Sequence, residues 1–282
     1  MPAATALRAE DYYSAEDYAF ILLLKGLSGL TDTERTEFAL ALSELATYLD
    51  ASDPDGFESA LERDMALTYR RYEDADFRRL VRLGLEYGTA AGSAACANFL
   101  GGLYYTGDVV ERDYRRAKEL FEFAEAKGIV QATINLGYIY EYGRLGTPDH
   151  ISAYLQYAKA AAAFSHTEAL YKLGDMYLRD TAVKRDPRCA YALYRRSIEL
   201  AQGARQLAQP AIRIAKMISD PDYAEFDIPY SPLGALELFQ LAERGLRISI
   251  AEGDLYYRPR LAEAIEGQER MRRLLDDPSI CL

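Results

Sequence analysis

The chain has 282 residues, half of them hydrophobic, and a formal charge of −11. This acidity argues against a nucleic-acid or anionic-membrane surface, because both need clustered Lys and Arg. The longest apolar run, residues 19–24, is far shorter than the roughly 18 residues that a membrane-spanning helix needs. The N-terminal residues show no basic region followed by an apolar one, so we expect no signal peptide and a cytoplasmic chain.

The first 93 residues predict helices that belong to no complete repeat. Ser14 with Asp17, and Thr31 with Glu34, are N-cap pairs that predict helices over 15–28 and 32–49. We assign residues 1–56 to an N-terminal helical cap that ends in a turn. A helix over 57–72 follows, and the segment from Asp76 resembles the second half of a repeat, so 57–93 form a degenerate first helix pair.

One pattern occurs three times between residues 94 and 203. The segments "CANFLGGLYYTG", "ATINLGYIYEYG" and "ALYKLGDMYLRD" place Leu-Gly at a period of 36 or 37 residues. A second half follows each in step, with Asp113, Asp149 and Asp186 aligned, and then Ala, an aromatic residue and a small residue. Self-similarity at this period indicates stacked supersecondary units.

Each unit predicts two helices. Leu and Tyr, four apart, share a face of the first helix, and the Gly between them lets a neighbouring helix approach closely. Gly107 and Gly143 suit the left-handed position that ends a helix, and Asp180 is a substitute in the third unit. The aligned Asp residues suit the N-cap of the second helix, and Pro187 follows one of them at the first helical position. The recurrence of Leu136, Gly137, Tyr140, Ala153 and Tyr157 indicates a packing role for them.

Residues 204–258 predict a degenerate fourth repeat, from about 211 to 245. The positions expected for Leu, Gly and Tyr hold Ile214, Ala215 and Ile218. The second half keeps its Ala, aromatic and small positions as Ala235, Phe239 and Ala242. Its connection is longer than in the other units, and residues 220–230 are either a surface loop or a binding element. Pro259 opens a last helix, so residues 259–282 form a C-terminal capping helix.

The pattern A-x-x-x-L-G-x-x-Y-x-x-G, followed by Asp, Ala, an aromatic residue and Ala, resembles the Sel-one-like repeat, a relative of the tetratricopeptide repeat. The resemblance implies an all-α, right-handed α–α superhelix, a solenoid with atypical helical caps. It further implies a non-catalytic adaptor of bacterial type that binds a protein or peptide on the concave face, which the first helices line.

Candidate binding residues occupy the first-helix positions that the repeat pattern leaves free. They are Asn98, Tyr105, Tyr138, Glu141, Tyr142, Tyr171, Asp175 and Arg179. Tyr is enriched at interfaces, because it combines a large contact area with a polar tip. Two alternatives are that a Tyr-rich chain scatters Tyr everywhere, and that the N-terminal helices of the same chain cover this surface.

Motifs that carry chemistry are missing from the sequence. The two histidines, His150 and His166, look like surface residues beside loops, and with no Cys pair a zinc site is not expected. Neither a phosphate-binding glycine loop nor a nucleophile elbow occurs, so we expect no cofactor and no catalytic residue. One alternative function is a homodimer that buries the Tyr-rich face. Another is an enzyme that binds or hydrolyses β-lactams, like cysteine-rich members of the family, but Cys96, Cys189 and Cys281 do not form their paired pattern.

Overall fold

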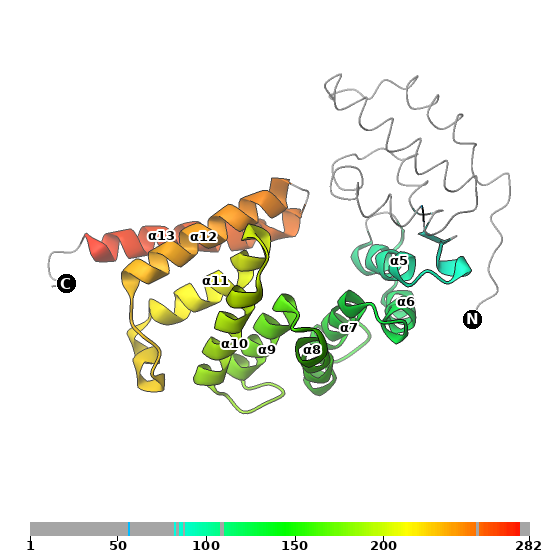
Figure 1. Cartoon of the computed structure of the whole chain (residues 1–282), viewed down its shortest axis with the longest axis horizontal. Coiled ribbons are helices and arrows are strands. Elements are labelled where there is room, and N and C mark those ends of the chain that lie inside the picture. The colour runs from blue at the N-terminus through cyan, green and yellow to red at the C-terminus, as the bar shows by residue number, and fades with distance from the viewer. Residues whose placement is uncertain are drawn as a thin grey trace, which may run out of the picture. The chain divides into compact units, whose positions relative to one another are not determined.

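The structure is a computed structural model of the chain, and it describes residues 88–107, 110–251 and 254–276 together with residues 56, 82, 85 and 86. All regular elements in these ranges are helices (Figure 1). The chain divides into two compact units, Met1–Asn135 and Leu136–Leu282. The helices predicted over 15–28, 32–49 and 57–72 lie outside the described residues.

Consecutive helices pair as helix–turn–helix repeats, which confirms the all-α helical-repeat fold class. The pairs are α5 (Ala94–Thr106) with α6 (Tyr114–Ala126), α7 (Val130–Glu141) with α8 (His150–Phe164), α9 (Thr167–Arg179) with α10 (Pro187–Leu200), and α11 (Ala204–Ile218) with α12 (Pro232–Ala251). The last helix, α13 (Arg258–Leu275), packs on α12 and begins where Pro259 predicts it.

The predicted helix ends are confirmed. Asp113, Asp149 and Asp186 are N-caps of α6, α8 and α10, and each carboxylate accepts hydrogen bonds from backbone amides of the first turn. Gly107 and Asp180 are left-handed, with φ of 77° and 55°, and they are the C-caps of α5 and α9. These caps satisfy backbone groups that a helix end leaves without an intrahelical partner.

One backbone hydrogen bond closes the turn of every repeat. The amides of Asp113, Asp149 and Asp186 donate to the carbonyl oxygens of Tyr104, Tyr140 and Tyr177 at 2.9–3.0 Å. In the fourth repeat Ser231 donates to the carbonyl of Ile218 at 2.7 Å, although its connection is longer. The repeat position of Ile218 is therefore confirmed, because the longer connection keeps the hydrogen bond that closes the other turns.

The longer connection of the fourth repeat is packed against the repeats. It contains a short 3-10 helix, η1 (Pro221–Phe226), and the side chain of Ile228 is buried. Arg188 of α10 donates from Nε to the carbonyl oxygen of Phe226 at 3.0 Å and pairs with Asp227. Residues 226 and 227 of this connection are thus held against the N-terminal turn of α10.

The glycine of each first helix lies against the aromatic ring of its second helix. A Cβ atom built on Gly101, Gly137 or Gly174 would lie 2.8 Å from a ring carbon of Phe121, Tyr157 or Tyr194 respectively. All three rings are at most 1% exposed. The Leu-Gly pair therefore recurs because no side chain fits between the two helices.

Three sequence-based expectations need correction. Tyr140 is only half-buried rather than part of the core, and His166 is partly buried rather than a surface residue. Helix α11 begins at Ala204, the first residue of the segment 204–258 that the sequence assigns to the fourth repeat, and Pro210 lies inside this helix. Gly245 does not end the repeat, because α12 continues to Ala251 and a Cβ on Gly245 would meet the backbone of Ala204.

Candidate interaction site

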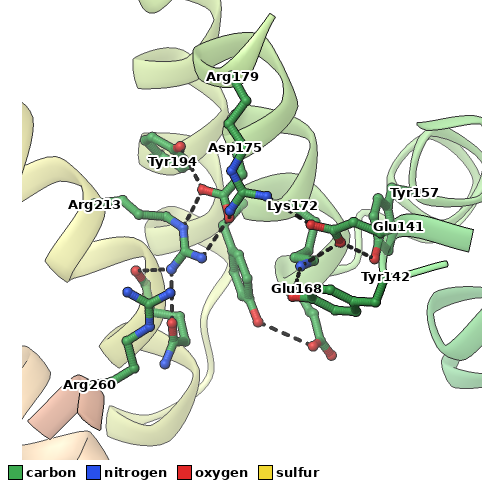
Figure 2. Close-up of polar contacts among 12 residues, drawn as sticks. Glu141, Tyr142, Tyr157, Glu168, Lys172, Asp175, Arg179, Tyr194, Arg213 and Arg260 are labelled. Carbon is green, nitrogen blue, oxygen red and sulfur yellow. Dashed lines mark hydrogen bonds and ion pairs between the residues drawn. The ribbon is translucent and has the colours of Figure 1, made fainter. Parts of the chain in front are cut away.

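Two buried carboxylates on the first helices organise the polar residues of the unit formed by residues 136–282 (Figure 2). Glu141, the last residue of α7, is 5% exposed. It accepts a hydrogen bond from the hydroxyl of Tyr157 at 2.8 Å. Lys172 and Arg179 of α9 reach it at 2.7 and 2.9 Å. Glu141 thus joins its own second helix to the first helix of the next repeat.

Asp175 of α9 makes the same kind of junction one repeat later. It is 5% exposed and accepts from the hydroxyl of Tyr194 at 2.8 Å. Arg213 of α11 binds it through Nε and Nη2 at 2.6 and 2.7 Å, a bidentate pair. We call Glu141, Lys172, Asp175, Arg179 and Arg213 the ion-pair network.

Electrostatics favour the ionised form of Asp175. Burial alone would raise the pKa of Asp175, but Arg213, through its charge and hydrogen bonds, together with the charges of Lys172 and Arg179, outweighs burial and holds that pKa below its usual value. Burial and the neighbouring carboxylates raise the pKa of Tyr157 and Tyr194 far above the usual value, so both hydroxyls stay protonated and donate. A carboxylate that is paired and hydrogen-bonded in this way has little of its desolvation penalty left uncompensated.

Tyrosine rings surround the cations of the network. The Nζ atom of Lys172 lies 4.7 Å from the ring centroid of Tyr138 and 5.2 Å from that of Tyr142. These two rings stack, with centroids 5.8 Å apart and planes 8° apart. The guanidinium of Arg213 lies 4.5 Å from the ring centroid of Tyr171. Both cations therefore gain cation–π attraction in addition to their ion pairs.

Acid should weaken this unit through Asp175. Because its folded pKa is below its unfolded pKa, the stabilisation is complete above about pH 4 and is lost as the pH falls through the lower folded pKa. Urea unfolding at a series of pH values should show this loss in the wild-type chain and a smaller one in Asp175→Asn. An equal loss in both chains would show that Asp175 does not contribute.

The structure brings some predicted binding residues together and buries others. Tyr138, Glu141, Tyr142, Asp175 and Arg179 meet around the ion-pair network in the unit 136–282. Their exposure differs sharply. Tyr142 is 47% exposed and the side chain of Arg179 is 49% exposed, whereas Glu141 and Asp175 are buried.

The remaining predicted positions are largely occupied by contacts within the chain. Tyr171 is buried, and its hydroxyl donates to Glu168 at 3.2 Å. Asn98, in the other unit, is buried and accepts from Asn135 at 3.0 Å. Tyr105 packs edge-on against Tyr114. The expectation that all eight positions are free for a partner is therefore wrong for the buried ones.

Sequence reasoning missed Lys172 and Arg213. Both stand one residue before the repeat leucine or its substitute, at Leu173 and Ile214. A cation at one repeat position, opposite a carboxylate on the preceding first helix, is the signal that could have revealed the network.

Among the described residues no helix is long and apolar enough to cross a membrane. Across the same residues, no group of three or more His, Cys, Asp or Glu side chains has an arrangement that could hold a metal ion. Cys96 is buried and Cys189 is half-buried.

Comparison with known proteins places the repeats in a family. The Sel1 repeat model matches residues 94–129, 130–163 and 167–201. A stretch of 52 residues is 40% identical to the ERAD-associated E3 ubiquitin-protein ligase component HRD3B of Arabidopsis thaliana, but it covers 18% of this chain and only 9% of that protein.

Two solved structures share the fold. A Sel1 repeat protein from Oxalobacter formigenes has a TM-score of 0.52 at 18% identity, over 82% of this chain and 99% of the other. The protective antigen c5321 of uropathogenic Escherichia coli, described as displaying an SLR fold, has a TM-score of 0.50 at 18% identity, over 95% of this chain and 55% of the other. The helical-repeat solenoid fold that the sequence predicts is thereby confirmed.

Proposed function

Residues 94–201 of this chain are Sel1 repeats, and from that premise we propose that the chain is a non-catalytic adaptor that binds a protein or peptide. The binding surface that we propose lies on the first helices of the unit 136–282 and is centred on Tyr142 and Arg179. The sequence leads us to expect a partner on the concave face that the first helices line, and we restrict the contact residues to the exposed side chains of that face.

The observation that carries the proposal is that Tyr142 and Arg179 are half-exposed yet held in place. Tyr142 stacks on Tyr138, and its hydroxyl accepts from Lys172 at 3.2 Å. Arg179 is held by Glu141 at 2.9 Å and by Asp175 at 3.5 Å. Tyr and Arg dominate the energetic centres of interfaces, and fixing them before binding reduces the entropy lost on association.

Charge favours a partner that offers carboxylates or carbonyl oxygens to Arg179. The two buried carboxylates already have buried cations of their own, since Lys172 pairs with Glu141 and Arg213 with Asp175. The guanidinium of Arg179 carries five donors, so those on its exposed side remain for a ligand. The net charge of −11 opposes nucleic acid as that ligand.

A pull-down from cells that make the chain tests this function. The double variant Tyr142→Ala, Arg179→Ala should lose the bound protein, because both proposed contacts are removed. The matched control is Tyr230→Ala, Arg196→Ala, which removes the same residue types at similar exposures of 44% and 55% elsewhere in the unit. Both variants must keep the helical circular-dichroism spectrum of the wild type.

Equal recovery by the wild-type chain and the Tyr142, Arg179 variant would contradict the proposed surface. Loss in the control variant alone would move the site to the outer face and the 220–230 connection.

A further inference from the structure

The outer face of α8 carries an exposed apolar stripe. Ile151 and Leu155 are 66% and 60% exposed, and Ala158 and Ala162 continue the same line along the helix. Their spacing of four, three and four residues puts all four on one narrow face. In soluble helices, this spacing marks the seam that faces another helix.

The stripe is particular to this repeat. The same four positions hold Arg115, Glu119, Glu122 and Ala126 in α6, and Arg188, Ala192, Arg195 and Glu199 in α10. Most of those residues are exposed and charged, as expected of a solvated helix face. Helix α8 contains no Asp or Glu, and Lys159 is its only Lys or Arg.

We propose that the outer face of α8 binds the same face of a second copy of this chain, with the two α8 helices antiparallel. The stripe has large side chains, Ile and Leu, at its N-terminal end and small ones, both Ala, at its C-terminal end. A two-fold axis at mid-helix places Ile151 against Ala162 of the second copy and Leu155 against Ala158 of the second copy. A single register produces both pairs, and in each pair a large side chain meets a small one. The patch is therefore self-complementary, as a two-fold dimer requires.

Charge selects this face for self-association. Two copies that each carry a net charge of −11 repel one another. A contact with carboxylates on both sides would add to that repulsion. The stripe on α8 brings no carboxylate into the contact. A helix of 15 residues is only about 22 Å long, so the interface is at the small end of specific contacts and the dimer should be weak and concentration-dependent.

Sedimentation equilibrium of the full chain over a wide concentration series tests the proposal. The wild-type chain should shift from monomer to dimer as concentration rises. Leu155→Glu should weaken the dimer by about a hundredfold or more, because the two-fold axis buries two unpaired carboxylates. The matched control is Leu233→Glu on α12, where the side chain is 58% exposed, and this variant should dimerise like the wild type.

A second variant tests the orientation. Ala158→Leu removes the small residue that faces Leu155 of the second copy, so it should weaken an antiparallel dimer. In a parallel pair, the two introduced leucine side chains would meet each other and strengthen the dimer, which would overturn the register. A wild-type chain that stays monomeric throughout, or a dimer that Leu155→Glu leaves intact, would overturn the proposal. The second result would point to the Tyr142 surface as the dimer contact.

Discussion

Replacing Gly137 by Ala should lower the free energy of unfolding by about 2 kcal/mol, and Gly137→Leu should lower it further. The added Cβ would lie 2.8 Å from Cζ of Tyr157, a ring that is fully buried and hydrogen-bonded to Glu141. The ring cannot yield without breaking that hydrogen bond, so α7 and α8 must separate. Urea unfolding followed by circular dichroism measures the loss.

Gly102 provides the matched control. It also lies inside a first helix, but a Cβ atom built there meets nothing within 4 Å. Gly102→Ala should therefore raise stability by about 0.5–1 kcal/mol, because alanine favours the helix and no contact opposes it. Opposite signs for the two Gly→Ala changes are the expected result. A neutral Gly137→Ala would contradict the close helix contact.

The second large effect is expected at Asp175. Asp175→Ala should destabilise the unit 136–282 by about 3–5 kcal/mol, because the guanidinium of Arg213 would remain buried without its bidentate partner. The hydroxyl of Tyr194 would also lose its acceptor. The measurement is again the free energy of unfolding in urea.

Two further variants separate charge from packing at Asp175. Tyr194→Phe removes one neutral donor to a carboxylate and should cost about 1.5–3 kcal/mol. In the double variant Asp175→Ala, Arg213→Met neither charge of this pair is left buried without its partner, so part of the loss should be recovered. If the double variant is as unstable as the sum of the two single variants, the two residues are not coupled and the network is not what joins α9 to α11.

The sequence predicts the repeat because each part of it has a local physical cause. Asp at an N-cap and Gly or Asp in a left-handed position are fixed by the backbone geometry at one or two residues, and Gly opposite an aromatic ring recurs at the same positions in three repeats. Such causes can be recognised without knowledge of distant contacts. They gave the three repeats, their turns, and the alignment of Ile218 with Tyr140 and Tyr177 in the degenerate fourth repeat.

Features that depend on tertiary packing were not predictable in the same way. Pro210 lies inside α11, where local preference opposes a helix, yet Pro210 is buried there among the core residues of the unit. The pattern of the fourth repeat ends near Gly245, but this residue lies inside α12 at a point of close contact with the backbone of Ala204. At Gly245, a contact from another helix decides the structure, and the local sequence pattern does not reveal it.

Only part of the candidate site could be predicted, because the rest of it depends on contacts between helices. Spacing along one helix places Glu141 and Asp175 on the first-helix face, and it does not show that the next helix covers them with Lys172 and Arg213. Residues that looked free for a partner are therefore largely used to join repeats. Tyr142 keeps its exposure at the end of its helix, and so does Arg179.

The most direct test of the account is site-specific photo-crosslinking in cells that make the chain. A photoreactive phenylalanine analogue would replace Tyr142 in one variant and Tyr230, which is 44% exposed, in another. We expect a crosslinked protein from position 142 and none from position 230. A crosslink from position 230 alone, or from neither position, would contradict the claim that the first-helix surface around Tyr142 and Arg179 binds a protein partner.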